Sequence, residues 1–225
     1  LADYVKYSGD TATGRDLWPV VKRQVEVARE ALDPAGIYDN ALKPSWLVFD
    51  WKSDLNRDAS IQVLMTFAVD RSYELARMLG TEKEVSGWPK LTARMKSAAR
   101  NAYYDRKSGL VLSGPDKQAS YLSQVWMVLS GTLSVKEGAR ALSAIMESPD
   151  ACRIGSPYAY HYFIEALIQC GLEEQARTAL IDYWGGMVHK GADTFWEVYD
   201  PEDDFKSPYG FFPINSYCHA WSCTP

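Results

Sequence analysis

The feature that most constrains the fold is the repeated spacing of apolar residues at three and four positions, because it is typical of helices that bury one face. Almost no stretch alternates between apolar and polar residues as a strand does. Asp16 is the predicted N-cap of the first helix, and Gly80, Gly131 and Gly171 stand where C-caps are expected. The sequence therefore predicts an all-α fold. We expect an eighth helix to begin near Asn215, after seven others at 16–32, 56–79, 89–104, 118–131, 135–147, 158–170 and 173–184.

Length and composition exclude several classes of protein. The 225 residues suffice for one domain, and 47% hydrophobic with 24% charged residues is not typical of disorder. No apolar run reaches the roughly 20 residues of a membrane span. The net charge is -5 and the basic residues are scattered, which argues against nucleic acid as a partner. Because the chain opens at Leu1 without an initiator methionine, we expect it to be a piece of a longer protein.

Two long connections between the predicted helices are rich in aromatic residues and carboxylates. They span residues 38–57 and 185–215, and loops of this kind are poor candidates for disorder, so we expect function there. Tyrosine and tryptophan suit an amphipathic ligand such as a sugar, although a large aromatic core would use the same residues. Alternating short and long connections fit a helical solenoid or a closed toroid of hairpins, and the lack of a fixed period disfavours the solenoid.

Glu197 is the strongest candidate for chemistry. It follows Trp196 and lies near Phe195 and Tyr199, and such neighbours would partly desolvate a carboxylate and suit it to proton transfer. The alternative is an exposed loop glutamate beside aromatic residues that pack inward.

Asp50 and His219 are further candidates. Asp50 lies in an aromatic run beside Trp51, where a carboxylate needs a partner or a hydroxyl-rich ligand. Asp54 or Asn56, just beyond it, is more simply explained as a helix N-cap. His219 is the third candidate, although a lone histidine is usually a hydrogen-bonded polar side chain without a catalytic role.

The sequence predicts neither a metal site nor a cofactor. The four cysteines do not have the paired spacing of zinc sites, so buried free thiols are the simpler interpretation. No P-loop, dinucleotide-binding glycine motif or nucleophile elbow occurs, so nucleotide and acyl-transfer chemistry lack support. The cysteines are Cys152, Cys170, Cys218 and Cys223.

Several motifs resemble those of the inverting α-L-rhamnosidases, and the likeness extends over nearly the whole chain. Residues 191–197 read G-A-D-T-F-W-E and residues 216–222 read S-Y-C-H-A-W-S, similar to that family's G-A-T-T-x-W-E and S-x-x-H-x-W/F-x-S. Residues 49–51 (F-D-W) resemble its F-x-D-W segment. Residues 7–10 (Y-S-G-D) with 17–21 (L-W-P-V-V) resemble a helix pair that several six-hairpin glycosidases share.

The resemblance implies an α/α toroid of six helical hairpins, here incomplete with about eight helices. Residues 1–225 would be the C-terminal part of one catalytic domain, without its first hairpins and its final helix. The rest of the same polypeptide would complete the barrel. A periplasmic or secreted location is also implied, since family members act on extracellular glycans.

For the site, the resemblance implies that Glu197 is the general base of an inverting glycosidase. Asp50, Trp51 and His219 would bind rhamnose, and the family's known substrates imply a carbohydrate ligand. Two further tryptophans would add walls to the pocket: Trp196 and Trp46.

Two departures from the family pattern qualify these expectations. The family's general acid lies in a segment of the type C-P-x-R-x-E-R, which is absent from residues 1–225, so we expect the acid upstream of this chain and no activity from the chain alone. Asp193 also replaces a threonine of G-A-T-T, which affects the geometry of the loop. The alternatives are a six-hairpin glycosidase for another sugar and a non-catalytic scaffold that binds carbohydrate or protein.

Overall fold

A computed structural model describes residues 1–44, 47–48 and 50–223 of the chain. The all-α prediction is confirmed, because the only strands among these residues are the short β1 (Leu112–Ser113) and β2 (Gln118–Ala119), paired antiparallel with Leu112 opposite Ala119. The α-helices within the described residues are α1 (Ala2–Ser8), α2 (Thr11–Glu30), α3 (Asp58–Leu79), α4 (Trp88–Tyr103), α5 (Tyr121–Leu129), α6 (Val135–Met146), α7 (Pro157–Gln169) and α8 (Glu173–His189).

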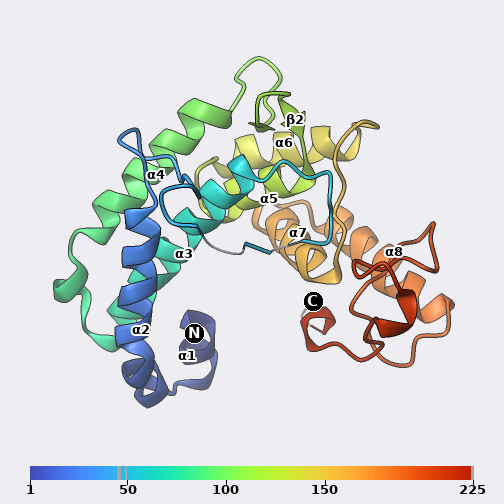
Figure 1. Ribbon diagram of the computed structural model, residues 1–225, viewed down its shortest axis with the longest axis horizontal. Helices are drawn as coiled ribbons and strands as arrows, with labels where there is room; N and C mark the ends of the chain where they lie inside the picture. The colour runs from blue at the N-terminus through green and yellow to red at the C-terminus, as the bar shows by residue number, and fades with distance from the viewer. Residues whose placement is uncertain (45–46, 49, 224–225) are drawn as a thin grey trace.

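The helices form an arc of hairpins in two layers (Figure 1). Helices α1, α3, α5 and α7 contact one another in succession along the inner layer. Each is followed by an outer helix that packs against it, namely α2, α4, α6 and α8. This alternation is the arrangement expected of part of an α/α toroid.

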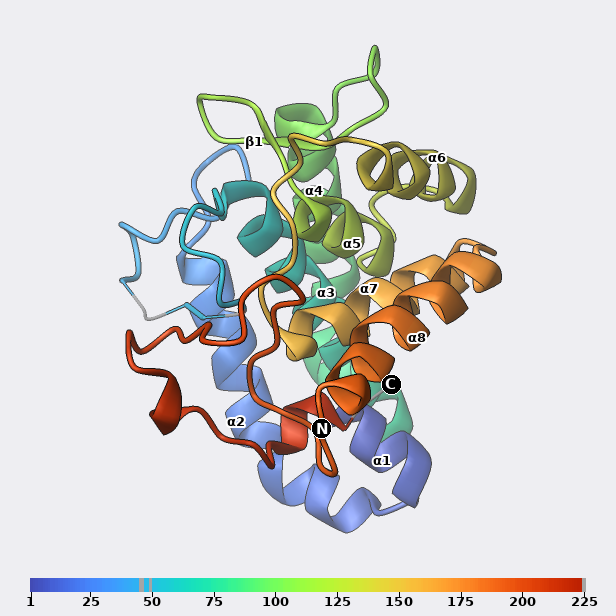
Figure 2. The same cartoon turned by 90° about the vertical axis from the view of Figure 1, so that its right-hand side faces the viewer.

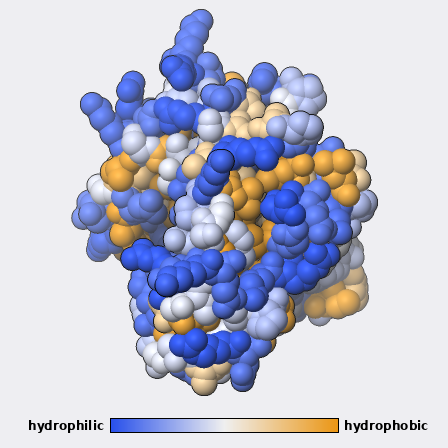
Figure 3. Space-filling view, turned by 90° about the vertical axis from the view of Figure 1, so that its left-hand side faces the viewer, coloured by the Kyte–Doolittle hydropathy of each residue, from blue (hydrophilic) through white to orange (hydrophobic). Residues whose placement is uncertain are grey.

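The core lies between the two layers and is centred on α5. Every residue of α5 is buried, and Trp126 and Met127 are among the largest side chains fully withdrawn from solvent. Helix α3 is buried on several sides, as its predicted apolar circumference requires. The outer face around α2 and α4 is covered mostly by hydrophilic side chains (Figure 3). None of the helices in the described part of the chain is long and apolar enough to cross a membrane.

The first predicted helix boundary is wrong. Helix α2 begins at Thr11, because the Asp10 carboxylate accepts a hydrogen bond from the Thr13 backbone amide at 3.0 Å and so acts as the N-cap in place of Asp16. Helix α1, which has no counterpart in the prediction, buries only Val5 and so lacks a periodic signal. Gly9, with a φ of 72°, makes the tight turn between α1 and α2.

The predictions at two other helix ends also need correction. Neither Asp54 nor Asn56 is the N-cap residue of α3, which is Arg57, although the Asn56 side chain accepts a hydrogen bond from the Asp58 amide at 3.1 Å. The helix expected near Asn215 is absent from the described residues, which form only the 3-10 turns Phe212–Ile214 and Ala220–Ser222 there. The Asn215 side chain instead donates to the Lys206 carbonyl at 2.7 Å and holds a loop together.

Candidate active site

Three segments from distant parts of the chain meet beside the N-terminal end of α7. The segment after α8, drawn in orange to red, folds back toward α7 (Figure 2) and contacts it through the turn Ala220–Ser222. The Ser156 side chain caps α7 by accepting from the Ala159 amide at 3.2 Å, which fixes the loop before the helix. That loop in turn contacts residues 50–51. The two long loops expected to carry function are therefore brought together.

Glu197 is buried in this junction, with 6% of its surface exposed. One carboxylate oxygen, Oε1, accepts a hydrogen bond from the Tyr209 hydroxyl, and Oε2 accepts from the Ser216 backbone amide at 3.0 Å. The Glu197 amide donates to the Ser216 carbonyl at 2.8 Å, and Trp221 Nε1 donates to the Glu197 carbonyl at 3.1 Å. The alternative of an exposed loop glutamate is thus excluded.

Two hydrogen bonds orient the Glu197 carboxylate, because one donor is aimed at each of its oxygens. The same contact raises the pKa of Tyr209, since the phenol donates its proton to Glu197 and is also partly desolvated. Each carboxylate oxygen has a second lone pair and can accept another hydrogen. The arrangement can therefore hold a base in one orientation and leave it able to bind water.

An aromatic cluster surrounds the partners of Glu197. The Trp51 ring lies 5.8 Å from that of Tyr209 and 5.7 Å from that of Trp221, measured between ring centroids. The Trp221 ring is 4.6 Å from His219 and 5.7 Å from Tyr158. Trp51 and His219, both predicted from the sequence, thus contact side chains that hydrogen-bond to Glu197. Trp51 contacts Tyr209 and Trp221, and His219 contacts Trp221.

His219 is oriented by its own turn. Its Nδ1 accepts a hydrogen bond from the Trp221 amide at 3.4 Å, while its amide donates to the Phe195 carbonyl at 2.9 Å. The hydrogen-bond pattern assigns the ring proton to Nε2 in the neutral form. His219 is half-buried, so this nitrogen can donate to a ligand hydroxyl.

Asp50 is close in sequence to Trp51, but its carboxylate is used by the loop before α7. The Gly155 amide donates to both of its oxygens, at 2.9 and 3.2 Å. Burial raises the pKa of Asp50, while the hydrogen bonds from Ser156 and Gly155 act in the opposite direction. Only 8% of Asp50 is exposed. The sequence left open whether the Asp50 carboxylate has a protein partner or binds a hydroxyl-rich ligand. In the structure it has a protein partner, the Gly155 amide.

The two other predicted wall residues are placed differently. Trp196 packs its ring against Tyr199 at 6.2 Å and Tyr217 at 5.5 Å, so it faces other neighbours than Trp51 does. Trp46 lies outside the described residues.

Two groups central to the site went unrecognised in the sequence. Tyr209 and Ser216 supply both hydrogen bonds to the Glu197 carboxylate. Ser216 belongs to a motif that marks the segment, but the S-P-Y-G turn around Tyr209 carries no comparable signal.

Two cavities border the aromatic cluster. One, of about 330 Å³, is lined by Asp50, Trp51 and Ser207 among others, and the second, of about 420 Å³, by Trp51, Tyr160 and Asp200 among others. Neither Glu197 nor its partner Tyr209 lines these two cavities. Within the described residues, no group of three or more histidine, cysteine, aspartate or glutamate side chains is arranged to hold a metal ion.

The cysteines are free thiols, as expected, but only partly buried. Cys152 and Cys170 are buried, whereas Cys218 and Cys223 are exposed. Burial raises the pKa of Cys152 to about 11, so its thiol stays protonated at neutral pH.

Comparison with known proteins gives a consistent result. Residues 2–225 match the family model described as the bacterial alpha-L-rhamnosidase 6 hairpin glycosidase domain. A search of curated proteins finds no match.

Three solved structures are similar to the chain. A rhamnosidase from Klebsiella oxytoca with rhamnose bound is 39% identical, with a TM-score of 0.90 over 99% of this chain and 43% of that one. A GH78 family rhamnosidase of Bacillus sp. GL1 is 21% identical, with a TM-score of 0.83 over 98% of this chain and 24% of that one. A Streptomyces avermitilis alpha-L-rhamnosidase complexed with L-rhamnose is 20% identical, with a TM-score of 0.71 over 95% and 20%. The last two likenesses concern the fold alone, and the chain spans less than half the length of each.

Proposed function

Because the chain belongs to the bacterial α-L-rhamnosidase family of six-hairpin glycosidases, we propose that it is part of a glycoside hydrolase that releases terminal α-L-rhamnose with inversion. Glu197 is the general base, and the general acid comes from polypeptide outside this chain. The observation that carries the proposal is the buried Glu197 carboxylate, held by Tyr209 and Ser216 beside the Trp51 and Trp221 rings.

In this mechanism the ionised Glu197 takes a proton from water while the water oxygen attacks the anomeric carbon. The attack comes from the face opposite the leaving oxygen, which the general acid protonates, so the configuration at that carbon inverts. Inverting enzymes keep their two carboxyl groups about 6.5 to 9.5 Å apart, which leaves room for the water. The two donors to Glu197 keep its carboxylate oriented before the reaction.

The remaining predicted residues act in binding. The Trp51 ring offers an apolar surface to the methyl group and ring hydrogens of the deoxy sugar, and His219 donates from Nε2 to a sugar hydroxyl. Asp50 anchors Trp51 to the loop before α7 through Gly155, and its remaining lone pairs accept from sugar hydroxyls. Trp196 and Trp46 are additional walls in the proposal. No step uses a metal or a cofactor.

The wider context is also a proposal. Residues 1–225 form part of one catalytic domain, and the rest of the polypeptide completes the ring of hairpins. A periplasmic or secreted location fits a substrate that is a rhamnose-containing glycan or glycoside.

The test is Glu197→Gln in the complete protein, assayed on 4-nitrophenyl α-L-rhamnoside beside other aryl glycosides. We expect kcat to fall by about 10²- to 10⁴-fold with little change in KM, because the base acts mainly in the transition state. Asp203→Asn is the matched control, since Asp203 is an exposed carboxylate on the same loop and asparagine keeps the oxygen that accepts from the Phe205 amide. Thermal melting of both variants checks that the fold is retained.

Two results would contradict the proposal. Unchanged turnover in a folded Glu197→Gln variant removes Glu197 from the mechanism. Proton NMR of the first-formed rhamnose should show the β-anomer, and an initial α-anomer would exclude inversion.

A further inference from the structure

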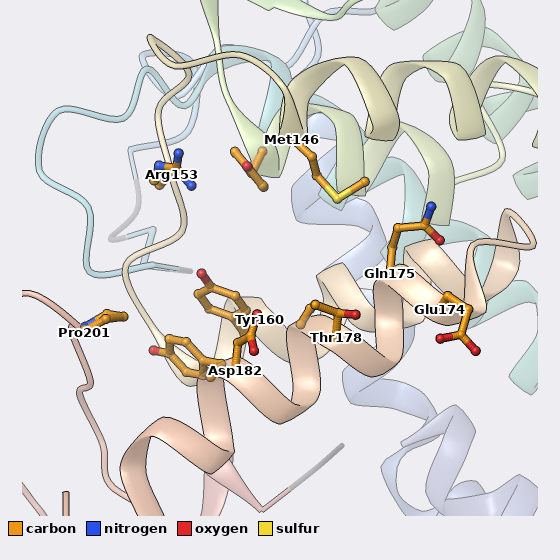
Figure 4. A pocket seen from close by; sticks show the side chains of 11 residues that line it. Met146, Arg153, Tyr160, Glu174, Gln175, Thr178, Asp182 and Pro201 are labelled. Atoms are coloured by element: carbon orange, nitrogen blue, oxygen red, sulfur yellow. The ribbon is translucent and has the colours of Figure 1, made fainter. Parts of the chain in front are cut away.

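A cavity of about 510 Å³ opens between the outer helices α6 and α8 (Figure 4), and Glu197 is not among its lining residues. We call it the outer groove. Its size lies within the range of small-molecule and sugar sites. Aromatic and apolar side chains form its floor, and polar side chains edge it. Its lining residues on α6, α8 and the loops include Met146, Arg153, Gln175, Thr178 and Asp182, and Tyr160 of α7 also lines it.

The outer groove adjoins the cavity beside the aromatic cluster. The two cavities share four lining residues, which are Arg153, Tyr160, Tyr183 and Pro201. The second cavity ends at Trp51, whose ring contacts both side chains that hydrogen-bond to the Glu197 residue. A ligand held at Trp51 can therefore extend along this path to the outer surface.

The polar groups of the outer groove have unused hydrogen-bonding capacity. Gln175, Thr178 and Asp182 are three and four residues apart, so they lie along one face of α8 and border the cavity (Figure 4). Among the described residues, no hydrogen bond or ion pair engages their side chains or the Arg153 guanidinium. These groups are free to bind hydroxyl groups.

Tyr160 supplies the floor of the outer groove. Its ring stacks on Tyr183 with centroids 3.7 Å apart and planes inclined by 20°. The Tyr183 hydroxyl donates to the Tyr199 carbonyl at 3.1 Å, whereas the Tyr160 hydroxyl has no partner within the described chain. Burial raises the pKa of Tyr160 to about 12, so this hydroxyl remains a neutral donor.

We propose that the outer groove binds the saccharide units to which the terminal rhamnose is attached, and so selects oligosaccharide glycosides over small aryl glycosides. The proposal rests on the hydrolase function given above. Aromatic floors with polar edges suit sugar rings, which present an apolar face and a rim of hydroxyls. The charged residues of the lining are one cation, Arg153, and two carboxylates, Glu174 and Asp182. The groove therefore lacks the excess positive charge that would select a phosphate or sulfate.

The test uses variants that alter the outer groove and leave the core unchanged. Thr178 is exposed on α8, so Thr178→Trp occludes the cavity, and Arg177→Trp puts the same side chain on the same helix outside the lining. Gln175→Ala is a second variant that removes hydrogen bonds without adding bulk. The complete protein is assayed on 4-nitrophenyl α-L-rhamnoside and on trisaccharides with terminal α-L-rhamnose on cellobiose in different linkages.

We expect Thr178→Trp to lower the ratio of kcat/KM for the preferred trisaccharide to that for the aryl glycoside by about tenfold or more. Gln175→Ala should lower the ratio less, and Arg177→Trp should leave it unchanged. An equal ratio in the unmodified protein and Thr178→Trp overturns the proposal.

Saturation-transfer NMR with the same trisaccharides separates this proposal from the hydrolase function. If the unmodified protein hydrolyses no rhamnoside, the proposed function fails, and the groove is then judged by binding alone. Binding that is lost in Thr178→Trp and kept in Arg177→Trp supports the groove, and binding that is equal in both, or absent from the unmodified protein, refutes it.

Discussion

Replacing Tyr209 with phenylalanine tests whether the hydrogen bond to Glu197 serves catalysis. The substitution removes only the hydroxyl that donates to Oε1, and it keeps the ring that lies 5.8 Å from Trp51. Glu197 then retains the Ser216 amide as its one donor within the described residues. The carboxylate therefore loses part of its orientation.

The magnitude follows from the exposure of Tyr209. A hydrogen bond to a charged group contributes about 1.5 to 3 kcal/mol when it is withdrawn from water. Tyr209 is 48% exposed, so water replaces much of the lost bond, and we discount the effect to about 1 kcal/mol. That corresponds to about a fivefold fall in kcat.

The assay is steady-state hydrolysis of 4-nitrophenyl α-L-rhamnoside by the complete protein between about pH 4 and 8. Tyr217→Phe is the matched control, because Tyr217 lies on the same segment, is similarly exposed at 45%, and its hydroxyl makes no hydrogen bond within the described chain. A Tyr209→Phe variant with the unmodified enzyme's kcat at every pH would show that the contact is only structural.

Two further predictions concern stability. Gly155→Ala should destabilise the protein by about 1 to 3 kcal/mol in thermal or urea unfolding, because a Cβ there would lie 2.8 Å from the Trp51 carbonyl oxygen. The control Gly87→Ala should change stability little, because the space around its Cβ is open. Equal effects of the two substitutions would refute the assigned contact. Glu137→Gln should lower the melting temperature at pH 7, because the Arg100 ion pair and the capping box with Ser134 lower the pKa of Glu137 from 4.5 to about 2. The folded state holds this proton less tightly than the unfolded state, so the difference should shrink as the pH falls from 4.5 toward about 2, and a difference that persists at the lowest pH would contradict the linkage.

The periodic helices could be predicted from the sequence because their signal is local. Helix α3 begins within two residues of the predicted start and α6 begins at the predicted one, since apolar spacing and turn residues are sufficient to mark them. The start of α2 could not be read in this way. It depends on an Asp10 cap that also accepts a hydrogen bond from Tyr4, and Asp16 offers an equally good cap in the sequence.

The site was predictable only in part, for a related reason. Three local motifs, each within its own segment, nominated Glu197, Trp51 and His219 as candidates. Their supports come from other segments, such as Gly155, which is 105 residues from the Asp50 carboxylate that it binds. A pattern of residue types contains no record of such pairings, because they are fixed by how the helices pack.

Asp50 shows how packing and function are joined at this site. Because burial raises its pKa above 3.8, the folded state binds a proton there more readily than the unfolded state, and Asp50 therefore reduces stability as the pH rises above that value. The two hydrogen bonds from the Gly155 amide offset only part of this cost. These hydrogen bonds fix the position of residues 50–51 beside the start of α7. Trp221 packs against the same end of α7 through Tyr158. Asp50 thus holds Trp51 against the two side chains that hydrogen-bond to Glu197, and this position of the Trp51 ring accounts for the burial of the Asp50 carboxyl group.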